Sequence, residues 1–184
     1  MPWFLYSFFA AILTSGAGLL EKKILIKEHA MGFAVLLAVI NAIFVLPIIF
    51  FLNLTNLSLI PMLIIFGESV IGAFAFLLMS KAIRHMEIGE VSSLRMLGPG
   101  LTAFLAFIFL GEDLNQFQIG GLLLIMVGLF VLETRGNSLN LKFSKYTFFI
   151  FIAIFIYAIT ALIGRVILSR YLIDPLTYIF FVHI

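Results

Sequence analysis

One acidic side chain of this sequence lies in the middle of an apolar stretch. Glu68 follows Ser58 by ten residues, and apolar residues continue from there to about Ala82. At ~1.5 Å rise per helical residue, Glu68 lies ~15 Å into a helix, near the mid-plane of a bilayer. A carboxyl group there can carry a coupling proton or balance a cationic substrate. Alternatively it is structural, either protonated or hydrogen-bonded to Asn41, which precedes Asn53 by twelve residues and so lies at a similar depth.

A basic side chain, Arg95, lies near the start of another apolar stretch. Arg95 is ~7 Å inside Glu90, whereas Glu68 is ~21 Å from that same side of the membrane. A direct salt bridge between Arg95 and Glu68 would therefore require a broken helix. We expect Arg95 to extend to the membrane interface or to contact Glu21 or Glu90 there. The functional alternative is a gate or an anion-binding group near one mouth of a cavity.

Three further polar side chains and a proline lie within apolar stretches. Thr14 in the first stretch, and Tyr157 and Thr160 in the sixth, lie at mid-membrane depth, where they line either a cavity or a contact between helices. Small residues on such a face favour close helix packing, which is the structural alternative for Thr14. Pro99 stands between two glycines and predicts a kink in the fourth helix, with freed carbonyls that either line a cavity or only shape the packing.

The residue types do not support several other chemistries. The sequence has no cysteine and three isolated histidines, and the neighbouring acids Glu112 and Asp113 supply too few oxygens for a metal ion. It contains no catalytic Ser/His/Asp set, HExxH motif or phosphate-binding loop. The formal charge of +2, without a basic stripe carrying aromatic residues, does not favour nucleic acid. We therefore predict a protein that is not an enzyme and that holds neither metal nor cofactor.

These side chains belong to a chain suited to a lipid environment. Of its 184 residues, 64% are hydrophobic and 11% are charged, whereas a soluble domain has about a quarter charged residues. The long apolar runs approach the ~20 residues that cross a bilayer. The predicted fold is an all-α integral membrane protein. Its expected helices cover residues 2–26, 30–52, 58–82, two runs within 88–132 joined by a connector at 111–118, 146–169, and a last one from 175.

An internal repeat relates the two ends of the chain. A shift of 143 residues places Lys22 on Arg165 and Lys27 on Arg170, among aligned apolar residues. The implied unit has five helices, and an odd number places successive units upside down relative to each other. The last helix stops at residue 184 after about half a span, so we expect a fragment of a longer protein. The predicted organisation is a first domain at 1–134, a polar linker at 135–144, and the incomplete start of an inverted second domain at 145–184.

Basic residues gather in the loops on one side of the predicted membrane domain. By the positive-inside rule these loops face the cytoplasm, which places the N-terminus outside. The loops follow the first, third and fifth helices, and their basic residues are Lys22, Lys23, Lys27, Lys81, Arg84, Arg135, Lys142 and Lys145.

The segments around the fourth and fifth helices carry an ordered set of small, acidic and proline residues. The set comprises Ala82-Ile83-Arg84, Ile88-Gly89-Glu90-Val91, Pro99, Leu110-Gly111-Glu112, Gly120 or Gly121, and Gly128. In this order and spacing it resembles the EamA-like domain of the drug/metabolite transporter superfamily. The resemblance covers about residues 3–134 as one complete five-helix domain, and 145–184 as the first one and a half helices of a second.

The resemblance implies a ten-helix secondary carrier in the cell membrane, whose two inverted halves enclose a cavity and move small metabolites or drugs by alternating access. Its expected partners are the lipid bilayer, a small-molecule substrate, a proton or another coupling ion, and either a missing second half or a second copy of the chain. Family members more often have the N-terminus inside, so the two indications of orientation disagree. The alternative function is a non-transporting membrane subunit or scaffold, or an inactive fragment of a transporter.

Overall fold

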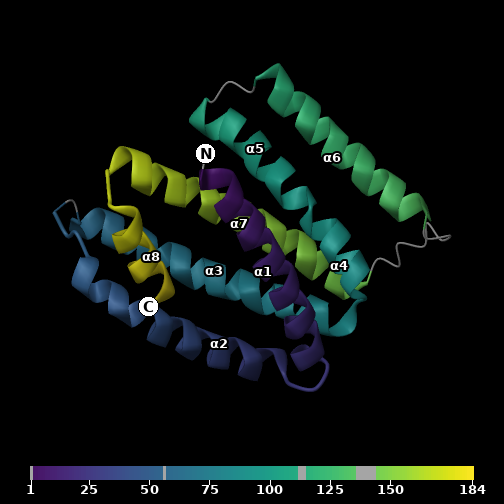
Figure 1. Ribbon diagram of the computed structural model, residues 1–184, viewed down its shortest axis with the longest axis horizontal. Coiled ribbons are helices and arrows are strands. Elements are labelled where there is room, and N and C mark those ends of the chain that lie inside the picture. Colours follow the sequence, from purple (N-terminus) through teal and green to yellow (C-terminus); the bar gives the residue numbers. More distant parts are fainter. Residues whose placement is uncertain (1, 56, 112–114, 136–143) are drawn as a thin grey trace.

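All regular structure in the described part of the chain is helical (Figure 1). The computed structural model describes residues 2–55, 57–111, 115–135 and 144–184. Within them, five segments are long and apolar enough to cross a membrane. The predicted all-α membrane fold is therefore confirmed, and the chain is a multi-pass membrane protein. The elements are α1 (Pro2–Leu25), α2 (Ala30–Val45), η1 (Leu46–Phe51), α3 (Leu59–His85), α4 (Ile88–Arg95), α5 (Leu97–Leu110), α6 (Gln116–Arg135), α7 (Lys145–Arg170) and α8 (Pro175–His183).

The second apolar stretch changes its helix type at a proline. α2 gives way at Leu46 to the 3₁₀ helix η1, and Pro47 lies in the first turn of η1. Proline has no N–H to donate, and its ring clashes with the carbonyl four residues earlier, so a regular α-helix cannot continue through it. The tighter η1 carries the chain on to Phe51, one residue short of the end predicted from the sequence.

The sequence predicts one kinked fourth helix, whereas the structure has two shorter helices in its place. α4 ends at Arg95, Met96 forms a turn, and α5 follows directly. Pro99 accounts for this interruption, because its nitrogen cannot donate to the carbonyl of Arg95 and its ring crowds that carbonyl. Together α4 and α5 still form one apolar segment that is long enough to span a membrane.

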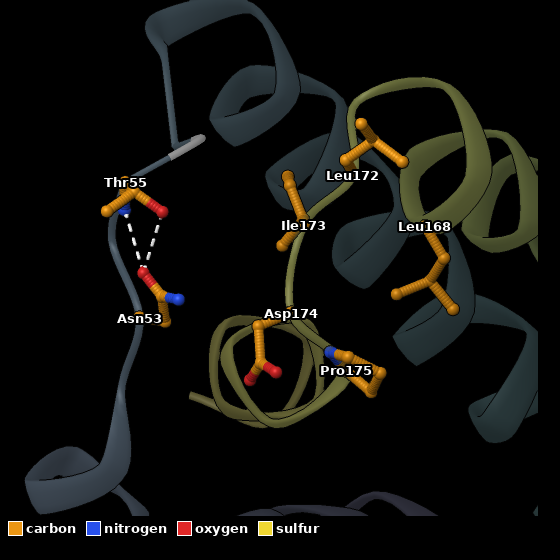
Figure 2. A pocket seen from close by; sticks show the side chains of 7 residues that line it. All are labelled: Asn53, Thr55, Leu168, Leu172, Ile173, Asp174 and Pro175. Carbon is orange, nitrogen blue, oxygen red and sulfur yellow. Dashed lines mark hydrogen bonds between the residues drawn. The ribbon is translucent and has the colours of Figure 1, made fainter.

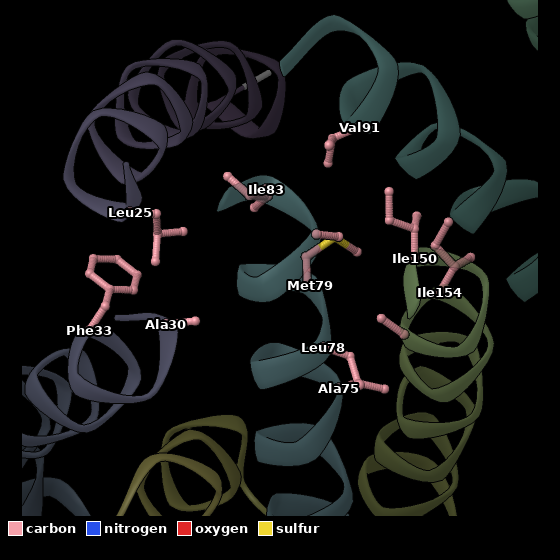
Figure 3. Close-up of a cluster of buried hydrophobic side chains, with 12 residues drawn as sticks. Leu25, Ala30, Phe33, Ala75, Leu78, Met79, Ile83, Val91, Ile150 and Ile154 are labelled. Carbon is pink, nitrogen blue, oxygen red and sulfur yellow. The ribbon is translucent and has the colours of Figure 1, made fainter. Parts of the chain in front are cut away.

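The core lies where α7 packs along α3, with α5 on another side of α7 (Figure 1). Four alanines of this contact are at most 1% exposed, namely Ala75, Ala82, Ala153 and Ala158. Small residues at these positions let the helix backbones approach closely, as is common in membranes. Larger apolar side chains from α1, α2 and α4, including Leu25, Phe33 and Val91, complete the cluster (Figure 3).

α1 is joined to the core at its C-terminal end. Leu25 is fully buried, and the Nζ of Lys22 donates hydrogen bonds to the carbonyls of Ile83 at 2.5 Å and Met86 at 2.7 Å. These carbonyls lie at the end of α3, where a cation also interacts favourably with the helix dipole. Residues 4–17 of α1 are exposed, as are most described side chains of α6. Both helices therefore present apolar surface to lipid.

α8 begins where the sequence predicts. Asp174 caps it by accepting hydrogen bonds from the N–H groups of Leu176 at 3.0 Å and Thr177 at 3.2 Å, and Pro175 occupies its first turn. The buried Thr177 hydroxyl also accepts from the N–H of Asn53 and donates to the carbonyl of Asn53, both at 3.1 Å. These bonds fix α8 against the link between η1 and α3.

Candidate functional site

Four helices line a cavity of about 540 Å³. Its walls come from α2, α3, α7 and α8, and most of the lining side chains are apolar, including Phe76 of α3 and Val182 of α8. Four of the site residues predicted from the sequence line this cavity: Asn41, Glu68, Tyr157 and Thr160. The fold thus brings polar groups from three separate helices to one apolar chamber.

Glu68 is the acidic group of the cavity, and only 6% of its surface is exposed. Its Oε1 accepts a hydrogen bond of 2.5 Å from the hydroxyl of Tyr178 on α8. Its Oε2 is buried and has no hydrogen-bond partner among the described residues. The structural alternative named Asn41 as the partner of Glu68, but the partner is Tyr178. An unpaired buried carboxylate oxygen is costly in free energy.

Tyr157 and Thr160 contribute the polar groups of α7. The Thr160 hydroxyl donates to the carbonyl of Tyr157 at 3.1 Å, one turn earlier in the helix. Tyr157 itself lines the cavity. Outside the cavity, one oxygen of Glu21 on α1 is buried without a hydrogen-bond partner in the described chain.

Arg95 and Thr14 are the two predicted site residues that do not line the cavity. The side chain of Arg95 is exposed. This placement agrees with the difference in depth between Arg95 and Glu68. Thr14 lies on the exposed part of α1, so it is not buried in the close helix contact that was its structural alternative.

The sequence alone did not indicate two residues of the site, Tyr178 and Gly164. Tyr178 lies 110 residues from Glu68, and by residue count it enters the membrane ~9 Å less deeply. The side chains of Tyr178 and Glu68 extend toward each other and together span this difference. Gly164 of α7 lies against the same contact, because a Cβ there would be 3.0 Å from Cζ of Tyr178 and 3.6 Å from Oε1 of Glu68. With 14 glycines in the chain, no sequence pattern distinguishes this one.

The cavity extends from Glu68 toward one end of the helices. It is lined by residues 68–77 in the middle of α3 and by residues 31–41 of α2, which lead from that depth toward the basic residues at the ends of α1 and α3. On the other side of Glu68, an apolar cluster of Ile65, Ile167 and Ile173, each at most 4% exposed, fills the space between α3, α7 and the start of α8. The cavity is therefore blocked toward the end opposite the basic residues.

A smaller cavity of about 350 Å³ lies at that opposite end, beside the connection between α7 and α8 (Figure 2). Its polar side chains are already engaged. The Oδ1 of Asn53 accepts from the N–H of Thr55 at 3.2 Å and from its hydroxyl at 2.7 Å, while the carboxylate of Asp174 caps α8. We therefore place the candidate site in the larger cavity.

Comparison with known proteins gives one match. The model of the EamA-like transporter family matches residues 1–134, which include both Asn41 and Glu68. No curated protein and no solved structure matches the chain. The family match covers most of the sequence and includes the first four membrane-spanning segments. The chain belongs to the EamA-like transporter family.

Proposed function

We propose that the chain is part of a secondary carrier that moves small metabolites or drugs across the cell membrane by alternating access, with the cavity around Glu68 as its substrate and coupling site. The observation that carries the proposal is the free, buried Oε2 of Glu68 at an apolar cavity between membrane-spanning helices. Membership of a family of drug and metabolite transporters supports the same conclusion.

The energetics of a buried carboxylate favour this assignment over a purely structural one. An ionised carboxylate within the membrane is costly unless it is paired, and such groups generally mark ion or substrate pathways. Tyr178 satisfies one oxygen of Glu68 and leaves the other available. A proton or a cationic substrate group on Oε2 completes the site, so that binding and release of that group accompany each transport cycle.

The one-sided form of the cavity supports alternating access. The binding chamber extends toward the basic end of the helices, and the cluster of Ile65, Ile167 and Ile173 blocks the other end. A carrier of this kind exposes its site to one side at a time, and rearrangement of α8 and α7 against α3 would exchange the open and blocked ends. Repeat-built carriers achieve this exchange by rocking one half against the other.

The organisation into domains is part of the same proposal. Residues 1–134 form a five-helix domain, residues 135–144 link it to the next, and residues 145–184 begin an inverted second domain of a ten-helix carrier. The cavity supports this division, because α2 and α3 supply one part of its wall, and α7 and α8 supply the other. A site between two halves of the protein is suited to a motion of one half relative to the other.

Transport by the Glu68→Gln variant tests the proposal. The complete protein is reconstituted in liposomes, and uptake of radiolabelled amino acids, sugars and cationic dyes is measured with and without an imposed pH gradient. We expect wild-type protein to accumulate at least one compound in response to the gradient. Glu68→Gln should fold normally and lose that accumulation, because glutamine keeps the shape of the side chain but cannot exchange a proton.

The matched control is Glu28→Gln, which changes an exposed carboxylate in the loop between α1 and α2. This control should retain wild-type accumulation. Gradient-driven uptake that is equal in Glu68→Gln and wild type would show that Glu68 is not the coupling group.

A further inference from the structure

Three helices meet at the buried carboxyl group of Glu68. Glu68 comes from α3, the Tyr178 hydroxyl that donates to its Oε1 comes from α8, and Gly164 of α7 packs against both. The other titratable groups that face this cavity are Tyr157 of α7 and His183 of α8, while α2 faces it with the amide of Asn41. Tyr178 is therefore the group that directly contacts the carboxyl group.

Gly164 is distinctive among the glycines of the described chain. It lies inside α7 with helical backbone, where glycine costs ~1 kcal/mol relative to alanine, so no turn or left-handed conformation accounts for it. A Cβ at this position would be 3.0 Å from Cζ of Tyr178 and still closer to its hydroxyl oxygen. Real Cβ atoms do not approach another atom as closely as this Cβ would approach the hydroxyl oxygen. At the other described glycines the nearest atom to such a Cβ is 3.2 Å away or farther. The absence of a side chain at position 164 is what admits the tyrosine hydroxyl.

We propose that Tyr178 is a positioning residue for Glu68 and that Gly164 provides the space through which its hydroxyl reaches the carboxyl group. The proposal rests on the proposed function of Glu68. By engaging Oε1, Tyr178 fixes the rotamer of the carboxyl group and leaves Oε2 as the atom that takes the proton or cationic group. Gly164 acts only through Tyr178, since even a Cβ at position 164 would be 3.6 Å from Oε1, an ordinary van der Waals contact.

This hydrogen bond also couples the occupancy of Oε2 by a proton or a cationic group to the position of α8. A hydrogen bond to an ionised carboxylate is roughly twice as strong as one to a neutral group. Tyr178 therefore binds α8 to α3 more tightly when Glu68 is ionised and less tightly once Oε2 carries a proton. α8 lies against the apolar cluster that blocks one end of the cavity. Protonation of Glu68 therefore weakens the packing of α8 at that blocked end.

The test measures the protonation of Glu68 in the complete protein reconstituted in liposomes. Infrared difference spectra recorded over a pH titration follow the carboxylic C=O band that Glu68→Gln removes. In Tyr178→Phe, we expect the midpoint of this band to rise by about 1 to 2 pH units, because the donor to the charged form is lost. Gly164→Ala should give a shift in the same direction, because its methyl group displaces the Tyr178 hydroxyl.

Two comparisons make the result specific. Gly67→Ala adds a methyl group beside Glu68 on α3 where nothing lies within 4 Å, and it should titrate as wild type. In the double variant Gly164→Ala/Tyr178→Phe, the alanine should add little to the shift of Tyr178→Phe, because the displaced hydroxyl is already absent. If Gly164→Ala does not fold, Tyr178→Phe alone decides, since it removes a single oxygen.

The outcomes separate this proposal from the proposed function. Midpoints of Tyr178→Phe and Gly164→Ala that equal wild type, while Glu68→Gln still abolishes gradient-driven uptake, would overturn the positioning role and leave the carrier function standing. A wild-type spectrum without a titrating band that depends on Glu68 would overturn the positioning role and, with it, the assignment of Glu68 as the group that carries a proton. Shifted midpoints in both variants, with an unshifted Gly67→Ala, support the proposal.

Discussion

At the scale of single residues, depth in the membrane predicts where a polar group lies but not which group it meets. Counting residues from Ser58 placed Glu68 in the middle of the membrane, and the structure buries it at the cavity. The same count offered Asn41 as a partner, whereas the observed partner is Tyr178, which lies nearer a helix end. The count fails there because it measures backbone positions, whereas a tyrosine hydroxyl extends well beyond its own Cα.

The buried Thr177 hydroxyl leads to a prediction about stability. Thr177→Val keeps the shape of the side chain but leaves the N–H and carbonyl of Asn53 without the two partners that the hydroxyl supplies. We expect the free energy of unfolding to fall by about 1–3 kcal/mol, measured by denaturant titration of the protein in detergent micelles.

The control for Thr177 is Thr102→Val. The Thr102 hydroxyl donates to the carbonyl of Gly98 in its own helix at 3.0 Å, and that carbonyl gains little from the extra bond. We therefore expect Thr102→Val to change the free energy of unfolding by no more than about 0.5 kcal/mol. Equal losses in the two variants would mean that the contact between α8 and Asn53 does not stabilise the fold.

At the scale of elements, the sequence predicts helices better than it predicts their interruptions. Hydropathy locates each long apolar segment, and Asp174 followed by Pro175 marks the start of α8 correctly. Pro99 indicates a disturbance in the fourth helix, but proline chemistry alone does not place the one-residue interruption observed at Met96, where the backbone stays in the right-handed helical region. That choice depends on how α4 and α5 each pack against α7, which is information outside the local sequence.

The attachment of α1 to the end of α3 gives a prediction at this scale. Lys22→Met keeps an unbranched side chain but removes the ammonium group that bonds the carbonyls of Ile83 and Met86. We expect a loss of about 1.5–3 kcal/mol in the free energy of unfolding, because hydrogen bonds from a charged donor are removed at the end of a helix. Denaturant titration in detergent measures it.

The neighbouring Lys23 is exposed and provides the matched control. Lys23→Met removes the same charge from the same helix end, so it separates the carbonyl contacts from a general charge effect. Its expected change is within about 0.5 kcal/mol. A loss as large as that of Lys22→Met would show that charge, and not the contact with α3, stabilises the position of α1.

At the scale of the whole molecule, the site depends on segments that are far apart in the sequence. The family match covers residues 1–134, which hold α1 to α5 and nearly all of α6. Two walls of the cavity come from α7 and α8, beyond the matched residues. Composition and the internal repeat predict that such helices exist. Neither predicts that α7 packs along both α3 and α5, because near-uniform apolar helices carry little information about which of their faces meet.

The direction in which the cavity extends is testable with single cysteines, since the chain has none of its own. Ala38→Cys lies in the cavity wall, and Ile167→Cys lies in the cluster that blocks it. A membrane-impermeant thiol reagent should label Ala38→Cys from the side on which the exposed reference Lys23→Cys reacts. It should label Ile167→Cys from neither side in the absence of substrate.

Two outcomes would contradict this description of the cavity. Labelling of Ala38→Cys from the side opposite Lys23→Cys would reverse the open and blocked ends. Ready labelling of Ile167→Cys at rest would show that the apolar cluster does not exclude water. Protection of Ile167→Cys at rest, followed by labelling during transport, is the pattern expected of an exchange between the two ends.

The separation of Glu68 and Tyr178 by 110 residues affects how the protein is made. At ~5–20 residues per second, a ribosome adds Tyr178 roughly 5 to 20 s after Glu68. Throughout that interval α3 must wait in the insertion machinery, or enter the bilayer with its carboxyl group neutralised by a proton. In a nascent chain that stops before α8, the carboxyl group of Glu68 lacks the Tyr178 hydroxyl that donates to it. We expect membrane quality control to recognise the unpaired carboxyl group and to degrade such a chain.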